Sequence, residues 1–163
     1  MKIFHGSDVE VKNPQILPAN RLLDFGEGFY TTSSYEQAER WAWRVCQRNK
    51  TPRKIITVYE FDFHEAERKI NVMKYITPDS EWLRFVTYCR TGRNSGHNFD
   101  IVMGPVANDN VYATIQLFES GLLSEAETII RLKTEKIYDQ ILFHTKESLK
   151  YLGYIKHEIL ENK

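Results

Sequence analysis

Residues 55–63 form the longest stretch of alternating side chains in this chain, and this stretch restricts the fold most strongly. Apolar, aromatic and threonine side chains occupy the odd positions from Ile55 to Phe63, and Glu60 and Asp62 stand between them. A repeat of two residues is that of a β-strand, so the pattern predicts a long, half-buried strand. Shorter strands are expected at residues 28–32, 69–73, 99–103 and 138–144, and 154–159 is expected to form a last strand or helix. A short strand over 2–4 is expected to run into a turn at residues 5–7.

Helix signals lie between these strands. Ser34 and Gln37 have the spacing of a capping box, which predicts a helix that ends near Arg48. Four of its residues recur at helical spacing and are expected to face inward, namely Ala38, Trp41, Ala42 and Val45. Further helices are expected over 78–90, 108–120, 124–133 and 145–152. Strands dispersed among helices without strict β-α-β alternation predict an α+β fold with mixed or antiparallel sheets, and the length predicts one domain over 1–163.

The composition is that of a globular protein and narrows the classes of function. Apolar residues make up 42% and aromatic residues 13% of the chain, and 22 basic residues balance 22 acidic ones. Without a basic excess, nucleic-acid binding is not the default expectation. Cys46 and Cys89 lack the spacing of a zinc site and are expected to be reduced thiols, as in the cytoplasm. No signal sequence or membrane-spanning run is predicted.

Three familiar site patterns are rejected. Gly26 and Gly28 begin a partial dinucleotide-binding fingerprint, but its last glycine is missing and no βαβ unit comes after it. Ser7 and His5 could belong to a hydrolase triad, yet no strained GxSxG elbow is present. The remaining histidines lack metal-ligand spacing, so no metal site is predicted.

The sequence His5-Gly6-Ser7 is more informative in combination with two segments downstream of it. A glycine-flanked aromatic strand, Phe25-Gly26-Glu27-Gly28-Phe29-Tyr30, comes about twenty residues later, and a Trp-bearing helix comes next. This order resembles the poly(ADP-ribose) polymerase and diphtheria-toxin branch of the ADP-ribosyltransferases over residues 3–46. The whole chain is also similar to a small bacterial family of ADP-ribosyltransferase-like proteins, whose motifs match Gly104 to Asp109 and Gln140 to Thr145. The resemblance implies split antiparallel or mixed β-sheets surrounded by helices, with NAD as co-substrate.

The resemblance assigns a role to each motif residue. His5 would hold a ribose hydroxyl, Gly6 would give its backbone N–H and C=O to the nicotinamide amide, and Ser7 would bond the adenosine ribose. Glycine lacks a Cβ, so a ligand can lie against the chain there. Nicotinamide in NAD is a cationic ring that an aromatic face attracts, a role that falls to Tyr30 and, at the matching spacing, to Trp41.

Gln140 departs from the pattern because the resembled enzymes place a glutamate there. A carboxylate stabilises the oxocarbenium-like state in which the nicotinamide–ribose bond breaks, and a glutamine lacks this charge. Chain elongation is therefore not expected, whereas transfer of a single ADP-ribose or slow NAD hydrolysis is. Asp109 and Glu27 are the acids considered as substitutes, although Asp109 also suits a helix N-terminus.

The sequence leaves three hypotheses about function. The first is an NAD-dependent mono-ADP-ribosyltransferase that modifies a macromolecular target. Since some members of the resembled family look like toxins encoded beside small antitoxins, the resemblance also implies a toxin with a small antitoxin partner. The alternative is a catalytically weak or inactive module of this fold that binds NAD, another nucleotide or a protein. The third is 2′-phosphotransferase chemistry on RNA, which the neutral charge supports little.

Overall fold

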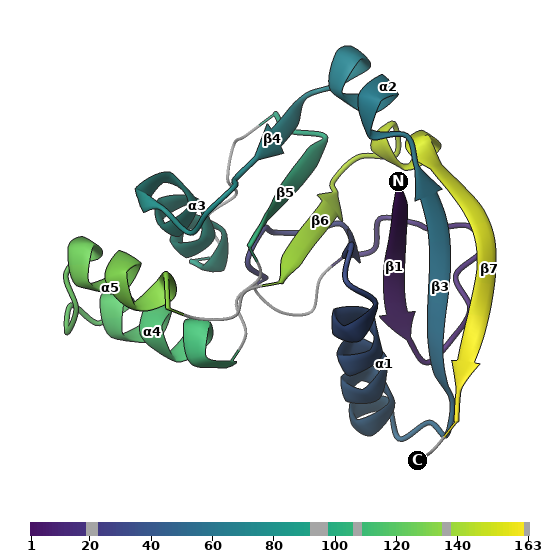
Figure 1. The fold of residues 1–163 in the computed structure, drawn as a ribbon, viewed down its shortest axis with the longest axis horizontal. Helices are drawn as coiled ribbons and strands as arrows, with labels where there is room; N and C mark the ends of the chain where they lie inside the picture. Colours follow the sequence, from purple (N-terminus) through teal and green to yellow (C-terminus); the bar gives the residue numbers. More distant parts are fainter. Residues whose placement is uncertain (19–22, 92–97, 106–108, 135–137, 162–163) are drawn as a thin grey trace.

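The computed structural model describes residues 1–18, 23–91, 98–105, 109–134 and 138–161, which form an α+β fold (Figure 1). Its strands are β1 (Lys2–Ser7), β2 (Phe29–Thr31), β3 (Lys54–Phe61), β4 (Val72–Lys74), β5 (Ile101–Pro105), β6 (Asp139–Phe143) and β7 (Leu152–Leu160). Its helices are α1 (Tyr35–Asn49), α2 (Phe63–Lys69), α3 (Ser80–Arg90), α4 (Asp109–Glu119) and α5 (Glu125–Leu132), with a short 3-10 helix η1 (Ser148–Tyr151). No helix in the described ranges is long and apolar enough to cross a membrane.

The first sheet is antiparallel and has the strand order β1-β3-β7. Strand β3 lies in its centre and is buried on both faces, so the prediction of a half-buried strand over 55–63 was wrong in its burial. Helix α1 covers one face of this sheet, and the apolar side chains of the second sheet cover the other. The strand also ends earlier than predicted, because Asp62 caps the N-terminus of α2 and Phe63 already belongs to that helix.

The second sheet has the strand order β2-β6-β5-β4 and is mixed, since β4 and β5 are parallel and the other pairs are antiparallel. The odd-numbered residues of β5 and β6, such as Ile141 and Phe143, face the first sheet and form a shared core with Ile3 and Tyr59. The even-numbered residues of β5 and β6, such as Leu142, face α3, α4 and α5 and form a second core. Each face of this sheet is therefore buried in a different apolar cluster.

The two sheets are joined where β1 meets β2. Phe4 and Thr32 exchange two backbone hydrogen bonds, of 2.8 and 3.0 Å, and form an isolated antiparallel bridge. No further pair of described residues extends this bridge into a ladder, so β1 and β2 belong to separate sheets. We call the region around this bridge the β1–β2 junction, comprising Phe4 to Gly6 and Tyr30 to Thr32.

Several predicted boundaries needed correction. Residues 5–7 do not form a turn, because β1 continues through Ser7 and pairs with β3 along its whole length. The helix expected over 145–152 is only η1, and β7 begins directly after it. On α1, Ala38 and Ala42 are buried as expected, but Trp41 and Val45 are half-buried.

A buried cation holds the segment before β2 in place. The Arg90 side chain is only 10% exposed, and its guanidinium lies 3.4 Å from a carboxylate oxygen of Asp24 and 3.8 Å from one of Glu119. It also lies 4.1 Å from the ring centroid of Tyr112. Arg90 thus connects α3 and α4 to the chain directly before Phe25, which is fully buried in the second core.

Candidate functional site

His5 connects the two sheets at the β1–β2 junction. Its Nδ1 lies 2.7 Å from the backbone oxygen of Tyr30, and its ring centroid lies 4.6 Å from that of Phe29. A carbonyl oxygen only accepts hydrogen bonds, so Nδ1 carries the proton and donates it. Burial lowers the pKa of His5 from the ordinary 6.5 and outweighs the opposite effect of the Tyr30 bond. The ring is therefore neutral at pH 7, and its Nε2 is a hydrogen-bond acceptor.

The backbone of Gly6 faces the edge of β1 that does not pair with β3, although Gly6 itself is buried. Successive residues of a strand direct their N–H and C=O groups to opposite sides, and Phe4 directs its groups to Thr32. Gly6 lies two residues further along and so directs its N–H and C=O to the same side, away from β3. No described residue forms a hydrogen bond with these two groups. One donor and one acceptor side by side match the two polar atoms of a carboxamide.

The missing side chain of Gly6 makes room for α1. A Cβ at this position would lie 1.9 Å from the backbone oxygen of Ala38 and 2.8 Å from the backbone nitrogen of Ala42. We expected a ligand to use this space, and in the structure the helix fills it. A ligand that uses the Gly6 backbone must therefore approach along the edge of β1 and not over its face.

Tyr30 and Trp41, the two expected walls of a nicotinamide slot, lie on different elements, β2 and α1. The Tyr30 side chain packs against the second core, and its hydroxyl donates a 2.5 Å hydrogen bond to the backbone oxygen of Gly26. Trp41 is half-buried on α1, and no ring of the described residues pairs with it. The structure thus brings the backbone of Tyr30 to His5, while stacking of nicotinamide on either ring remains a prediction.

Gln140 lies in the same row of residues as the bridge. The register of β2 and β6 places Thr32 opposite Gln140, and Gln140 pairs in turn with Gly104 on β5. Two strand spacings, or about 10 Å, separate the backbones of Phe4 and Gln140. The Gln140 side chain is 3% exposed, and its buried amide nitrogen has no hydrogen-bond partner among the described residues. An unsatisfied buried amide is costly, but this nitrogen has almost no accessible surface, so a ligand could contact it only if the Gln140 side chain turned outward.

Sequence reasoning missed Asp139 as a residue that shapes the junction. Its carboxylate oxygens lie 3.1 and 3.2 Å from the backbone nitrogen of Ser33, and one lies 3.1 Å from the Thr32 hydroxyl. This clamp holds the end of β2 against β6 beside Gln140. Its position directly before Gln140 was the only signal in the sequence that could have pointed to it.

The other predicted site residues are Ser7, Glu27 and Asp109. Ser7 ends β1, and its hydroxyl is directed to Asp8 at 3.4 Å. Glu27 is exposed between the two glycines, where it faces solvent in part. Asp109 is the first residue of α4, and its side chain lies outside the described part of the structure. Neither acid is shown beside His5 or Gln140.

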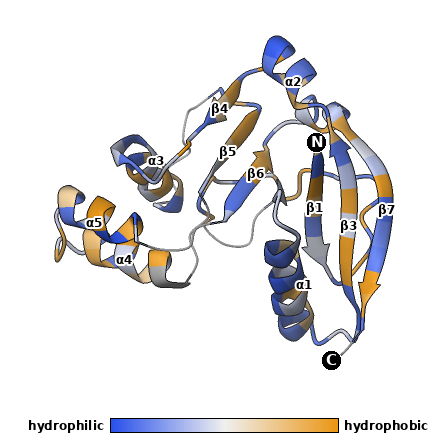
Figure 2. Cartoon of the chain, viewed as in Figure 1, coloured by the Kyte–Doolittle hydropathy of each residue, from blue (hydrophilic) through white to orange (hydrophobic). Residues whose placement is uncertain are grey.

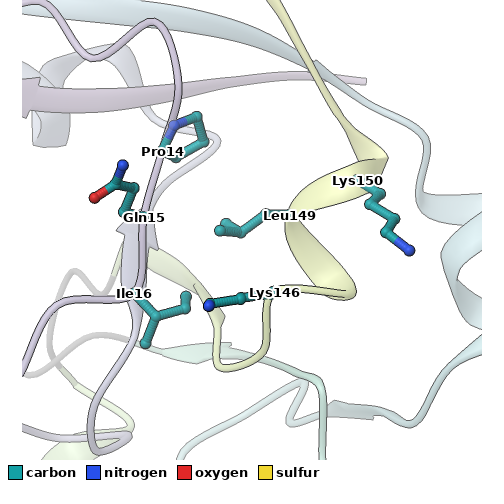
Figure 3. Close-up of a pocket in the computed structure, with 6 residues that line it drawn as sticks. All are labelled: Pro14, Gln15, Ile16, Lys146, Leu149 and Lys150. Carbon is teal, nitrogen blue, oxygen red and sulfur yellow. The ribbon is translucent and has the colours of Figure 1, made fainter.

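A pocket of about 540 Å³ lies elsewhere, between the segment Pro14 to Ile16 and the chain around η1. Leu149 and Lys146 point toward that segment and Lys150 points away from it (Figure 3). None of the predicted site residues lines this pocket. Within the described ranges, no three His, Cys, Asp or Glu side chains are grouped to hold a metal ion.

The comparison with protein families identifies the family of this chain. A family model described as "Protein of unknown function (DUF3990)" matches residues 1–154. The chain belongs to this family. No curated protein matches the chain, and no solved structure matches it either. The family description states no activity, so the geometry of the junction has to carry any functional argument.

Proposed function

We propose that this protein is an NAD-dependent mono-ADP-ribosyltransferase, with the split sheets of that fold, which modifies a macromolecular target. The observation that carries the proposal is the β1–β2 junction. Here the backbone N–H and C=O of the buried Gly6 lie on a strand edge that pairs with no other described strand, and the neutral ring of His5 is held beside them by Tyr30. The same residues carry the sequence resemblance to the ADP-ribosyltransferases.

The chain's own groups suit the parts of NAD that must be held. The Gly6 edge would take the nicotinamide carboxamide, and His5 Nε2 would accept a hydrogen bond from a ribose hydroxyl. If its side chain turned outward, the unsatisfied amide nitrogen of Gln140 would donate to an oxygen of the nicotinamide ribose. Bound NAD supplies an activated ribosyl carbon, because its bond to the positively charged pyridine ring is weak.

The uncharged Gln140 limits the rate and the product. A unit charge at about 4 Å is worth roughly 4 kcal/mol at an effective dielectric constant of 20, and Gln140 does not provide it. We therefore expect slow transfer of a single ADP-ribose and no chain elongation. Gln140→Glu should raise nicotinamide release by about tenfold or more. Burial favours a protonated carboxyl, so this gain should grow between pH 6 and pH 8.

The direct test incubates the purified protein with labelled NAD and a cell lysate. Release of nicotinamide and transfer of the label to a macromolecule support the proposal. His5→Ala should abolish both signals, and His64→Ala, which changes an exposed histidine on α2, should leave them unchanged. A folded wild-type protein that releases no nicotinamide at any pH between 6 and 8 would contradict the proposal.

A second candidate is a binding module without turnover. It is favoured by the missing carboxylate at Gln140 and by α1, which fills the space over Gly6. Calorimetry would then show binding of NAD or of a protein partner while no nicotinamide is released. Loss of a measurable NAD hydrolysis on His5→Ala would exclude this candidate.

Because the resembled family includes proteins that look like toxins encoded beside small antitoxins, we also propose that this protein acts as a toxin in bacterial cells. Expression of the wild type in a bacterial host should slow growth, and expression of His5→Ala should not. Equal growth of the two strains at equal protein levels would argue against a toxin and would leave the transfer reaction to be decided by the NAD assay.

A further inference from the structure

The second half of α1 and the turn after it are strongly basic. Residues 40–54 contain no acidic residue and six basic ones, although the whole chain has no net charge. The six are Arg40, Arg44, Arg48, Lys50, Arg53 and Lys54. Figure 2 shows α1 as a predominantly hydrophilic helix on the flank of the first sheet. The charge balance of the chain therefore conceals a local excess of positive charge.

Three of the six basic residues, Arg40, Arg44 and Arg48, lie on α1 itself. Ala38, Ala42 and Cys46 are buried against β1 and β3, and the helical repeat places Arg40 and Arg44 on the opposite side. Arg40, Arg44 and Arg48 succeed each other at four-residue spacing, which corresponds to about 6 Å along the helix axis. Such spacing is comparable with that of neighbouring phosphates in an extended nucleic-acid strand.

An aromatic side chain stands among these arginines. Trp43 is 53% exposed, lies next to Arg44 and is one helical turn from Arg40 and Gln47. The helix dipole accounts for basic residues near a helix C-terminus, and a charged helix face is often merely solvated. Neither effect accounts for an indole ring in water, which loses the free energy that its burial would supply.

Acidic groups on and near α1, Glu39 among them, compensate part of this charge. Glu36 pairs with Arg40 at 2.8 Å, and the Asp8 carboxylate accepts hydrogen bonds from Asn49 and Thr51. Glu158 is bonded to Tyr35 and Lys156. No ion pair with a described residue involves the basic side chains at 48, 50 and 53.

We infer that the outer face of α1 binds single-stranded nucleic acid, with a base stacked on Trp43 and phosphates held by the arginines. Stacking on an exposed aromatic side chain flanked by cations is how proteins hold unpaired bases. Because Gly6 packs directly under Ala38 and Ala42, this face lies about one helix diameter from the β1–β2 junction. We further infer that the bound strand is the acceptor of ADP-ribose, and this part of the inference rests on the proposed transferase function.

The test measures fluorescence anisotropy of a labelled 20-nucleotide single strand, as DNA and as RNA, without NAD. Three phosphate contacts to a single strand predict that affinity falls about twentyfold when NaCl rises from 50 to 200 mM. The Arg44→Glu, Arg48→Glu double variant should weaken binding more than tenfold and flatten this salt dependence. Trp43→Ala should weaken binding about tenfold and leave the salt dependence unchanged.

A matched control makes the same change of charge elsewhere. The Arg131→Glu, Lys133→Glu double variant alters two exposed residues at the end of α5, a helix that Figure 1 shows apart from α1, and should bind as the wild type does. All variants should melt within about 2 °C of the wild type, since the changed side chains are exposed.

Three results would overturn the inference. The first is that the labelled strand shows no saturable binding up to on the order of 100 μM protein at 50 mM NaCl. The second is that the α5 control loses as much affinity for the strand as the α1 variant does. The third is that polyglutamate displaces the labelled strand as strongly as unlabelled oligonucleotide does. The last would assign the face to an acidic protein. Nicotinamide release without strand binding would overturn this inference alone. Strand binding without nicotinamide release from any substrate would overturn the proposed transferase and leave the binding face.

Discussion

Gly6→Ala is expected to destabilise the fold because α1 leaves no space for a methyl group. The new Cβ would lie 1.9 Å from the Ala38 oxygen, whereas ordinary contact begins at 3.4 Å. The helix would have to move away from β1 by about 1.5 Å, the difference between these distances. Such a shift opens the packing of Ala38 against Ile56 and Val58. Overpacking against backbone is at the costly end of such changes, about 3 kcal/mol.

For a chain of this length, that cost corresponds to a fall of the melting temperature by roughly 6–12 °C. Thermal unfolding monitored by circular dichroism would measure it. Gly153→Ala in β7 is the matched control, since its Cβ would lie 3.8 Å from the nearest atom, the Glu60 oxygen. The control should melt at or slightly above the wild-type temperature, because alanine restricts the unfolded chain. A Gly6→Ala protein that melts within 2 °C of the wild type would refute the packing argument.

Four further perturbations test other parts of the structure. Burial lowers the folded-state pKa of His5 below its unfolded value, so the free energy of unfolding should fall as pH drops below about 6.5. Urea unfolding at pH 7.5 and at pH 5 measures this loss, and the difference between the two pH values should be smaller for His5→Gln than for the wild type. Gln140→Leu should keep or raise stability, by about 1 kcal/mol in urea unfolding, because it removes an unsatisfied buried donor, yet it should abolish nicotinamide release. Arg90→Met removes a cation from partly buried carboxylates and should cost about 2–3 kcal/mol, whereas Arg84→Met on the exposed side of α3 should cost under about 0.5 kcal/mol by the same measurement. Gly28→Ala should unfold at a lower temperature by several degrees, since its φ of 153° and a Cβ position 2.4 Å from the Phe143 oxygen both require glycine.

Local signals in the sequence predicted the elements whose ends are set by nearby side chains. Ser34 caps α1 by accepting from the Gln37 backbone nitrogen, and Ser124 and Glu127 form the full reciprocal capping box of α5. These bonds join residues three apart, so the spacing alone specifies them. The same holds for β2, whose glycine-flanked aromatic pattern was predicted within one residue at each end.

The errors in the predicted element bounds and in the predicted burial came from contacts between segments that are far apart in the sequence. The extension of β1 through Ser7 depends on pairing with β3 some fifty residues away, and nothing in the local sequence reports that pairing. The double burial of β3 likewise depends on α1 and on the second sheet. Helix α2 was missed because Phe63 continues the alternation of the strand, and only the Asp62 cap ends it.

The sequence by itself determined the α+β class, most of the helix starts and the set of residues worth inspecting, His5, Gly6, Tyr30 and Gln140. Only the tertiary structure decided how these residues meet. It showed that the Tyr30 backbone, and not its ring, holds His5, and that the space beside Gly6 belongs to α1. The physical reason is that periodicity and capping are properties of neighbours along the chain. Which face a side chain shares with another strand depends on register across the sheet, and that is settled only when the sheets pack.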